Sequence, residues 1–426
     1  MTKPVVVALE MGYGHLRAAA PLAEALGTEL LHADRPPLAD EAERRRWART
    51  RTAYERISRA SQVPFAGAPL RALLDTMTAI PPLYPFRDLS APTYATYALD
   101  RMITSGRLGR TLAEHLRKTG APLLTTFYST AVAADRLGIS PVWCVVTDTD
   151  INRIWVPVDP RASRIVYLTP AYRVDRRLRS YGVPAERIRF TGFPLPPALL
   201  GGPELPTLRR NLAARLVRLD PSGSFRRRAA PEIARVLGSL PDSEEGRAPL
   251  IVFAVGGAGA QSELPRSFLP EFKQPVLEGR VRLTLVAGVR AEVEAGFREC
   301  LRDTGLDGAV GSGIEIVREP TMEAYLRRMD GVLAEADVLW TKPSEMVFYA
   351  ALGLPLVLSW PVGVHERYNR RWVEEHGAGL RQRDPRSVAA HLAEWLSDGT
   401  LAAAAWSGFT RLPHSGLYGI LEAVGA

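Results

Sequence analysis

The sequence has 426 residues, which is too long for one ordinary domain and is typical of two domains. Its composition, 46% hydrophobic and 23% charged residues, is that of a soluble globular protein. Its two cysteines, Cys144 and Cys300, exclude a disulfide framework and a four-cysteine zinc site, and no apolar stretch reaches the roughly 18 residues of a membrane-spanning helix. The net charge of +8 comes mostly from arginine in an alanine-rich chain, so we attribute it to coding bias and expect no nucleic-acid partner. The first predicted strand follows "MTKP", so we expect no signal peptide and a cytoplasmic protein.

The first half of the chain alternates predicted strands with predicted helices such as 16–27 and 108–120. The strands are short, rich in β-branched and apolar residues, and end at turn signals. Near-continuous apolar strands predict a parallel sheet that is covered by helices on both faces. We predict these strands at 4–10, 122–129, 142–148, 164–169 and 187–192.

The second half repeats this organisation after a proline- and glycine-rich stretch, 193–206, which we interpret as a linker. The sequence therefore predicts an α/β fold with two Rossmann-like, doubly wound domains that face an interdomain cleft. The second set of strands is predicted at 250–257, 282–288, 314–319, 338–342 and 355–360. The expected domains are 1–200, with a basic and aromatic insert at 40–107, and 201–400, while 401–426 contains a helix that returns to the first domain.

A glycine-rich loop, "ALEMGYGHLRAAA" (8–20), ends the first predicted strand. A dinucleotide-binding fingerprint would have a third glycine where this chain has Arg17, so hydride transfer is only a weak alternative. A tight turn explains Gly12 and Gly14 but not the two polar residues beside them. Either Glu10 or His15 would be a general base if a substrate hydroxyl lay above this loop.

A second glycine-rich loop, "VFAVGGAGAQSEL" (252–264), follows the first strand of the second half. Backbone N–H groups of such a turn, together with the start of the next helix, form a concave site for a diphosphate. Three glycines directly after a buried strand favour this anion-binding interpretation over a simple turn.

The segment 336–379 adds polar groups to the second domain. Lys342 follows a buried strand, and a short helix over "SEMVFYAALG" ends at Gly353. A further strand leads into a polar loop with His365, Glu366 and Asn369. A cationic loop, a helix N-terminus and a loop that binds hydroxyls together suit a sugar nucleotide.

An Asp-x-Asp pair, Asp148 and Asp150, is of the kind that holds a divalent metal and a diphosphate in single-domain glycosyltransferases. It lies in the first domain, away from the second glycine loop, so we interpret it as lining the cleft or capping the next segment. The seven histidines offer no H-x-x-x-H pair, and we predict no metal site.

Taken together, these motifs resemble those of the inverting GT-B glycosyltransferases. This family includes monogalactosyldiacylglycerol synthase, the processive diacylglycerol glucosyltransferases and the peptidoglycan lipid-linked N-acetylglucosaminyltransferase. "GYGHLRAAAPLAEAL" is similar to the G-x-G-H loop of the diacylglycerol branch, and 145–195 follows its T-D-F-x-x-H-x-x-W to T-G-x-P segment. "GGAGAQ", "TKPSEMVFYAALGLPLVL" and "VHERYN" correspond to its later elements. The resemblance excludes about 40–107 and 200–248.

The resemblance implies roles for individual residues. The implied catalytic residues are Glu10 and His15. The implied acceptor-binding residues are Gly12, Tyr13, Gly14, Asp148, Asn152 and Trp155. The implied donor-binding residues are Gly256, Gly257, Gly259, Gln261, Lys342, Pro343, Ser344, Glu345, His365, Glu366 and Asn369. The chain departs from the family where P-G-G becomes Pro343, Ser344 and Glu345, where the ribose-binding glutamate falls near Ala350, and where a histidine becomes Asn152.

The implied reaction is inverting, metal-independent transfer of a hexose from a nucleoside-diphosphate sugar, expected to be UDP-linked, to an acceptor hydroxyl of a lipid or small molecule. The nucleotide sugar is a co-substrate, and no further cofactor is expected. The insert carries Trp47, Tyr54 and Phe65 among arginines, which indicates either a face for an anionic membrane, and so a peripheral location on the plasma membrane, or an ordinary helical cover. The alternatives are a sugar-nucleotide epimerase or hydrolase of the same fold and a non-catalytic sugar-nucleotide-binding protein.

Overall fold

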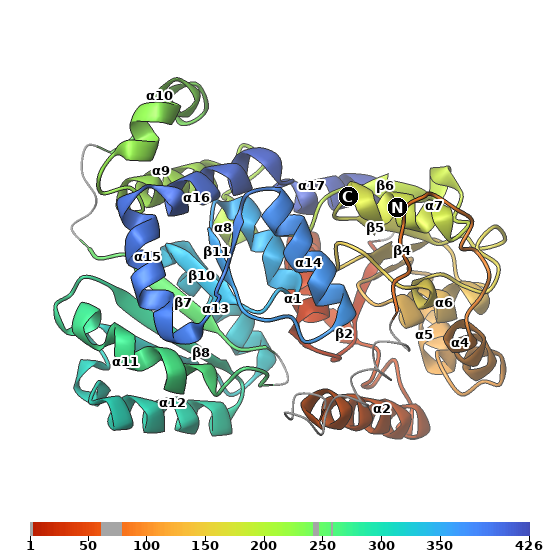
Figure 1. Cartoon of the computed structure of the whole chain (residues 1–426). Coiled ribbons are helices and arrows are strands. Elements are labelled where there is room, and N and C mark those ends of the chain that lie inside the picture. The colour runs from red at the N-terminus through yellow and green to blue at the C-terminus, as the bar shows by residue number, and fades with distance from the viewer. Residues whose placement is uncertain (1–2, 61–78, 242–246, 257–258) are drawn as a thin grey trace. The chain divides into compact units, whose positions relative to one another are not determined.

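A computed structural model describes residues 3–60, 79–241, 247–256 and 259–426 (Figure 1). The chain forms two compact units. Unit 1 comprises Met1–Leu195, Val362–Asn369 and Ser415–Ala426, and unit 2 comprises Pro196–Pro361 and Arg370–His414. The division therefore runs through the predicted linker, and the chain returns to unit 1 at Ser415 rather than at residue 401.

Unit 1 is built on a six-stranded parallel sheet with the strand order β2-β1-β3-β4-β5-β6. The chain passes from β1 outward to β2 and then crosses to β3 on the other side of β1, so the strand order reverses between β1 and β3. In open sheets of this kind, ligands bind beyond the carboxyl ends of the strands at such a switch point. The strands are β1 (Val5–Ala8), β2 (Leu30–His32), β3 (Leu123–Thr125), β4 (Val142–Val145), β5 (Val166–Thr169) and β6 (Ile188–Phe190).

The helices of unit 1 follow the strands as the apolar periodicity predicts, but the strands are shorter than expected, most of all the one predicted at 122–129. The strand predicted at 122–129 ends at Thr125, because the Thr125 hydroxyl accepts a hydrogen bond from the Phe127 N–H at 3.2 Å and turns the chain into α6. The α-helices are α1 (Tyr13–Leu26), α2 (Glu41–Ala60), α4 (Tyr94–Thr104), α5 (Arg110–Thr119), α6 (Tyr128–Arg136), α7 (Tyr172–Ser180) and α17 (Gly416–Val424). Two 3₁₀ turns are η1 (Arg153–Trp155) and η2 (Ala185–Arg187).

Unit 2 contains a second six-stranded parallel sheet with the order β12-β11-β10-β7-β8-β9, and here the order reverses between β7 and β10. Its core forms around Trp340 on β10, whose ring centroid lies 5.2 Å from that of Phe253 on β7 and 4.4 Å from that of Phe268 on the covering helix. The strands are β7 (Leu250–Ala254), β8 (Arg282–Gly288), β9 (Ile314–Arg318), β10 (Val338–Thr341), β11 (Leu356–Leu358) and β12 (Gly379–Arg381).

The helices of unit 2 surround this sheet, and α10 extends from the end of α9 (Figure 1). They are α8 (Pro197–Leu200), α9 (Pro206–Arg218), α10 (Ser224–Leu237), α11 (Leu264–Leu277), α12 (Ala291–Thr304), α13 (Met322–Glu335), α15 (Val388–Ser397) and α16 (Thr400–Arg411), with 3₁₀ segments η3 (Asp307–Ala309), η4 (Glu345–Leu352) and η5 (Pro385–Ser387). Helix α14 (Val364–Glu375) contributes its first residues to unit 1 and its last to unit 2. Among the described residues no helix is long and apolar enough to cross a bilayer.

These observations confirm the predicted α/β fold of two doubly wound parallel sheets. The short helix predicted before Gly353 is a 3₁₀ helix, η4, and Gly353 ends it with a φ of 67°.

Candidate functional site

The first candidate site lies at the switch point of unit 1. Strand β1 ends at Ala8, and α1 begins at Tyr13 after a short loop. Gly12 is the N-cap of α1 with a φ of 97°, a conformation that side chains other than glycine rarely adopt. Tyr13 is buried, and Gly14 lies inside the helix, so of the two loop glycines it is Gly12 that permits the turn.

His15 is held in a defined orientation by the residue after β3. Its Nδ1 lies 2.7 Å from the carbonyl oxygen of Thr126. A carbonyl oxygen only accepts, so Nδ1 carries a hydrogen and donates it to Thr126. In return, the Thr126 hydroxyl donates to the His15 carbonyl at 2.9 Å, and the Thr147 hydroxyl lies 3.4 Å from Nδ1. In a neutral ring with this tautomer, Nε2 is the nitrogen that can accept a proton.

Aromatic side chains surround the His15 ring. Phe127 packs edge-on to it with ring centroids 4.7 Å apart, and the Trp155 ring lies 6.4 Å away. Tyr128 lies 5.3 Å from Trp155, ring to ring. Trp155 is buried, and its carbonyl accepts a hydrogen bond from the Tyr167 hydroxyl at 2.9 Å. The predicted acceptor residue Trp155 thus lies in the same cluster as His15.

Glu10, the other candidate base, is paired with a cation. Its Oε2 lies 2.5 Å from Nη2 of Arg35, in an ion pair whose side chains are 30% and 48% exposed. One carboxylate oxygen of Glu10 therefore contacts a guanidinium, whereas the His15 ring is oriented by a backbone carbonyl.

Asn369, predicted at the donor sugar, is assigned to unit 1 and is fully buried there. Its Oδ1 accepts from both the N–H and the hydroxyl of Thr149 at 2.9 Å, and its Nδ2 donates to Oδ1 of Asp148 at 3.0 Å. The Thr149 N–H fixes which end of the amide is the oxygen. The side chain of Asn369 thus fastens the start of α14 to the loop after β4.

The two neighbours that were predicted with Asn369 also belong to the start of α14. Glu366 is 1% exposed, and its Oε2 accepts a hydrogen bond from the Val362 N–H at 2.6 Å. A glutamate that reaches back to a backbone N–H before its own helix stabilises the helix start. His365 packs its ring over Gly363, where an added Cβ would lie 2.8 Å from Cε1. Glu366 therefore has a structural partner in unit 1, whatever else it contacts.

Asp150 is a buried structural anion. Its carboxylate oxygens lie 2.7 Å from Nε of both Arg177 and Arg173, and Oδ1 also accepts from the Ile151 N–H at 3.0 Å. Burial lowers the pKa of Arg177, but the hydrogen bond and charge of Asp150 outweigh it and leave that pKa raised. The next segment, η1, has Asn152 as its N-cap and no side-chain cap hydrogen bond, so Asp150 does not cap it. Asn152 follows in the loop with its Oδ1 buried and without a hydrogen-bond partner among the described residues.

The second candidate site lies at the switch point of unit 2. A Cβ placed on Gly256, after β7, would lie 2.5 Å from Cε and 2.9 Å from Cδ of Lys342, after β10. Because Gly256 has no side chain, it leaves a groove in which the methylene groups of the Lys342 side chain lie. The turn closes through hydrogen bonds from Gly259 N–H to the Gly256 carbonyl at 2.8 Å and from Gly256 N–H to the Ala260 carbonyl at 3.4 Å. Gly257 lies outside the described residues.

The altered loop 343–345 leads directly into η4. The Ser344 N–H donates to the Lys342 carbonyl at 2.8 Å, and Glu345 is the first residue of the 3₁₀ helix. The far end of η4 is held by buried Arg215, which donates to the carbonyls of Leu352 and Gly353 at 2.9 and 3.1 Å. Burial lowers the pKa of Arg215 to about 10.

Ala350, the position expected for a ribose-binding glutamate, is fully buried within η4. An added Cβ on Gly408 of α16 would lie 2.2 Å from the Ala350 carbonyl oxygen, so the two backbones are closely packed. This packing explains the glycine at position 408, and Glu345 is the acidic residue of η4.

Gln261 connects the glycine loop to the loop after β11. Its Nε2 donates to the Trp360 carbonyl at 2.7 Å, and its backbone has a φ of 68°, which is rare outside glycine. Gln261 was predicted to bind the donor, and the structure gives its amide a partner within unit 2.

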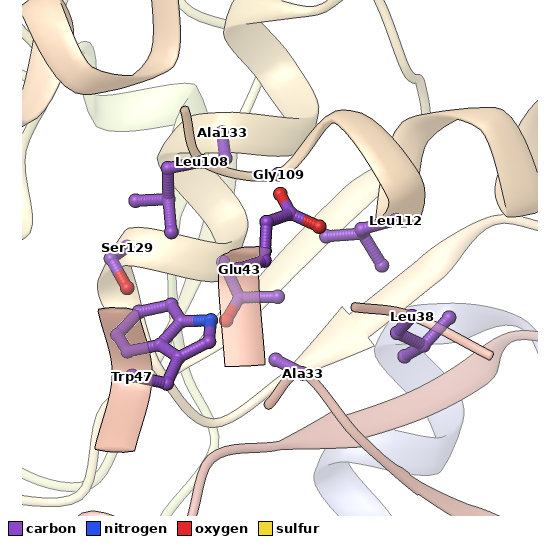
Figure 2. A pocket seen from close by; sticks show the side chains of 10 residues that line it. Ala33, Leu38, Glu43, Trp47, Leu108, Gly109, Leu112, Ser129 and Ala133 are labelled. Carbon is purple, nitrogen blue, oxygen red and sulfur yellow. The ribbon is translucent and has the colours of Figure 1, made fainter. Parts of the chain in front are cut away.

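A small pocket in unit 1 accounts for Trp47 (Figure 2). Figure 2 shows the indole of Trp47 beside Ser129, while the carboxylate of Glu43 points toward Gly109 and Leu112. Glu43 is buried and accepts a hydrogen bond from the Arg110 N–H at 3.2 Å. For Trp47, the pocket favours the interpretation of α2 as a helical cover over the interpretation of α2 as a membrane-binding face. The Tyr54 side chain and Phe65 lie outside the described residues.

Sequence reasoning missed Thr126, Thr147 and Trp360. A signal was available, because each directly follows, or nearly follows, the carboxyl end of a strand next to a glycine loop or a switch point. A neighbouring strand supplies the groups that orient a loop residue. The residues after β3 and β4 were therefore candidates for orienting His15.

Comparisons with known proteins agree with this architecture. No protein-family model matches the sequence. A processive diacylglycerol beta-glucosyltransferase from Bacillus mycoides (strain KBAB4) is 25% identical over 267 residues, which are 62% of this chain and 56% of the relative. The match thus spans little more than half of that relative's length.

Solved structures share the fold over nearly the whole chain. Acinetobacter baumannii MurG superposes with a TM-score of 0.50 at 14% identity, covering 99% of both chains. The S. aureus MnaA–UDP structure gives 0.51 at 12% identity, covering 99% of this chain and 95% of that one. UDP-GlcNAc 2-epimerase from Neisseria meningitidis, bound to UDP-GlcNAc, gives 0.50 at 11% identity, covering 99% of both. The resemblance found in the sequence is thus confirmed at the level of the fold: the chain has the two-sheet α/β architecture of the GT-B glycosyltransferases.

Proposed function

We propose that this protein transfers a hexose from a UDP-sugar to an acceptor hydroxyl with inversion at the anomeric carbon. The observation that carries the proposal is the Lys342 stem lying in the groove of Gly256 at the switch point of unit 2. A cation beside a glycine turn at this place in an open parallel sheet suits a diphosphate. The neighbours MnaA and UDP-GlcNAc 2-epimerase, whose structures hold UDP or UDP-GlcNAc, support a uridine nucleotide.

The diphosphate leaving group would be stabilised by unit 2. The N-terminus of α11 follows the glycine loop directly, and its aligned peptide dipoles favour a negative charge. Lys342 adds a full positive charge at the next strand. These groups meet the charge that develops on the departing UDP without reorganising during the reaction.

The acceptor would be activated by unit 1. Nε2 of His15 removes the proton from the attacking hydroxyl, while the Thr126 carbonyl holds Nδ1–H and stabilises the ring as it becomes positively charged. Trp155 lies beside the ring, and half-buried Tyr128 packs on Trp155 and supplies apolar surface on which an acceptor can pack.

A lipid acceptor such as diacylglycerol is supported by the name of the Bacillus mycoides relative. The exposed face of α4 suits contact with a membrane surface. It carries Tyr94, Tyr97 and Met102, which are 90%, 55% and 42% exposed, together with Arg101. Tyrosine and arginine are favoured where a helix meets anionic head groups.

The proposal is tested by offering the purified protein UDP-glucose, with and without vesicles that contain diacylglycerol and an anionic phospholipid. The expected result is a rise in melting temperature with UDP-glucose and formation of a glucosylated lipid with release of UDP. Release of UDP and free sugar without an acceptor would instead indicate a hydrolase, and interconversion of the sugar an epimerase. Thermal stabilisation without any turnover would indicate a binding protein.

Membrane contact is tested separately by co-sedimentation with the same vesicles. We expect a double Tyr94→Ala, Tyr97→Ala variant to sediment several-fold less than the wild type while retaining UDP-glucose binding. Equal sedimentation of the two proteins would remove α4 as the contact surface.

A further inference from the structure

Trp360 is a large apolar side chain that the structure leaves 65% exposed. It follows β11, two residues after the strand ends at Leu358, at the carboxyl edge of the unit 2 sheet. In the part of the chain that the structure describes, its indole stacks on no other aromatic ring. An exposed tryptophan at the ligand-binding edge of a sheet needs an explanation, because burying its ring would be favourable.

The residues on either side of Trp360 fix its position. Ser359 is buried, donates through its hydroxyl to Oε1 of Gln382 at 2.8 Å, and accepts from the Trp340 indole N–H at 3.1 Å. Pro361 follows and restricts the backbone of Trp360 to an extended conformation. The exposed indole is therefore carried by a rigid backbone.

The third restraint comes from the glycine loop itself. Gln261 donates from Nε2 to the Trp360 carbonyl at 2.7 Å, and it adopts a φ of 68° at the place where this hydrogen bond forms. Such a conformation is unfavourable for a residue other than glycine and persists only where surrounding interactions impose it. Gln261 immediately follows the turn 256–260, so Trp360 lies next to the groove that holds Lys342.

The order of the strands shows which part of a donor Trp360 would meet. A nucleotide sugar is a diphosphate with a ring at each end. If the diphosphate lies at the switch point between β7 and β10, one ring extends over β8 and β9 and the other over β11. Trp360 lies on the β11 side.

We infer that Trp360 is a stacking platform for one ring of the nucleotide-sugar donor, and that Gln261 is the positioning residue that holds it beside the glycine loop. This inference rests on the proposed function of unit 2. The donor ring that stacks on Trp360 is either the hexose, through its C–H face, or the nucleobase. Both kinds of ring stack on an indole.

The test is isothermal titration of the full chain with pyrophosphate, UDP and UDP-glucose. The variants are Trp360→Ala, Trp360→Phe as the conservative replacement, and Gln261→Gly, which removes the amide and relieves the positive φ. Tyr94→Ala is the matched control, because it removes an exposed aromatic ring from unit 1. Since Trp360 is exposed, its truncation leaves the core intact, and the melting temperature of each free protein verifies folding.

We expect Trp360→Ala to weaken UDP-glucose binding about three- to tenfold, with pyrophosphate binding unchanged and Trp360→Phe largely restoring affinity. If UDP binding is unchanged, the ring is the hexose, and if UDP weakens equally, the ring is the nucleobase. Gln261→Gly should produce the same pattern with a smaller loss.

Wild-type affinity for all three probes in Trp360→Ala would overturn the platform while leaving the donor site standing. If Trp360→Ala weakened pyrophosphate binding as much as UDP-glucose binding, the platform would also be overturned, since the substitution would then act on diphosphate binding. Failure of the wild-type protein to bind any of the probes would overturn the proposed function itself.

Discussion

Gly256 and Lys342 lie so close that a Cβ on the glycine would stand 2.5 Å from Cε of the lysine. The φ of Gly256 is not positive, so alanine is compatible with its backbone, and the atoms that must move belong to a flexible side chain. Substitution at Gly256 therefore changes the lysine position at little cost to folding.

We predict that Gly256→Ala weakens UDP-glucose binding about tenfold, the effect of losing one charge-assisted contact, while the melting temperature of the free protein stays nearly unchanged. Calorimetric titration and thermal unfolding measure the two quantities. Gly308→Ala is the control for alanine at a glycine of unit 2, because its φ is not positive and nothing lies within 4 Å of its Cβ position. A Gly256→Ala protein that binds UDP-glucose as tightly as the wild type would contradict the role of Lys342.

The orientation of His15 predicts that removing its ring lowers activity far more than removing the neighbouring Thr147 hydroxyl. His15→Ala should lower kcat about 10²- to 10⁴-fold with unchanged UDP-glucose affinity, because a general base acts in the chemical step. Thr147→Val should lower kcat less than about threefold, since its hydroxyl lies 3.4 Å from Nδ1 and the Thr126 carbonyl at 2.7 Å already holds the ring. A Thr147→Val enzyme as slow as His15→Ala would show that the hydroxyl, not the carbonyl, sets the tautomer.

Asn369 should matter for stability within unit 1. Asn369→Ala leaves the N–H and hydroxyl of Thr149 without their buried acceptor, which we expect to cost about 2–4 kcal/mol and to lower the urea midpoint. Arg371→Ala on the same helix removes an exposed ion pair and should change stability by less than about 1 kcal/mol. An Asn369→Ala protein with wild-type stability and lost UDP-glucose binding would restore the predicted donor role.

The contrast between Gly256 and Asn369 shows what the sequence can and cannot predict. Gly256 and Lys342 each follow an apolar strand, so periodicity alone places them at one edge of a sheet, and the whole α/β fold follows from the same pattern. Asn369 bonds to Thr149, 220 residues earlier, and no local pattern encodes that pairing. Motif similarity assigned Asn369, Glu366 and His365 to the donor. The partners of Asn369 depend on the tertiary packing, whereas Val362 beside Glu366 and Gly363 beside His365 are local in sequence.

Asp150 tests whether the Asp-x-Asp pair is structural. Asp150→Asn leaves the fully buried guanidinium of Arg177 without its counter-ion, which we expect to destabilise the protein by about 3–5 kcal/mol. Asp148→Asn is the matched control, because its amide oxygen can still accept from Nδ2 of Asn369, and it should cost less than about 1 kcal/mol. Urea unfolding compares the two. Equal losses in both variants would contradict the assignment of Asp150 as the structural anion of the pair.

His414 should make unit 2 sensitive to acid. Burial lowers the pKa of His414 below its ordinary value of 6.5, and the charge of Arg209 lowers it further. The unfolded chain therefore binds a proton at a higher pH than the folded chain does, so this contribution to stability is fully present above 6.5 and falls as the pH drops toward the folded pKa. His414→Phe keeps the stacking on Phe409, whose ring lies 5.1 Å away and nearly parallel, but cannot be protonated. Between about pH 7.5 and about pH 5.5, the melting temperature of His414→Phe should fall less than that of the wild type. Parallel curves for His414→Phe and the wild type would mean that His414 gains its proton equally in both states, and the acid sensitivity would have to come from other groups.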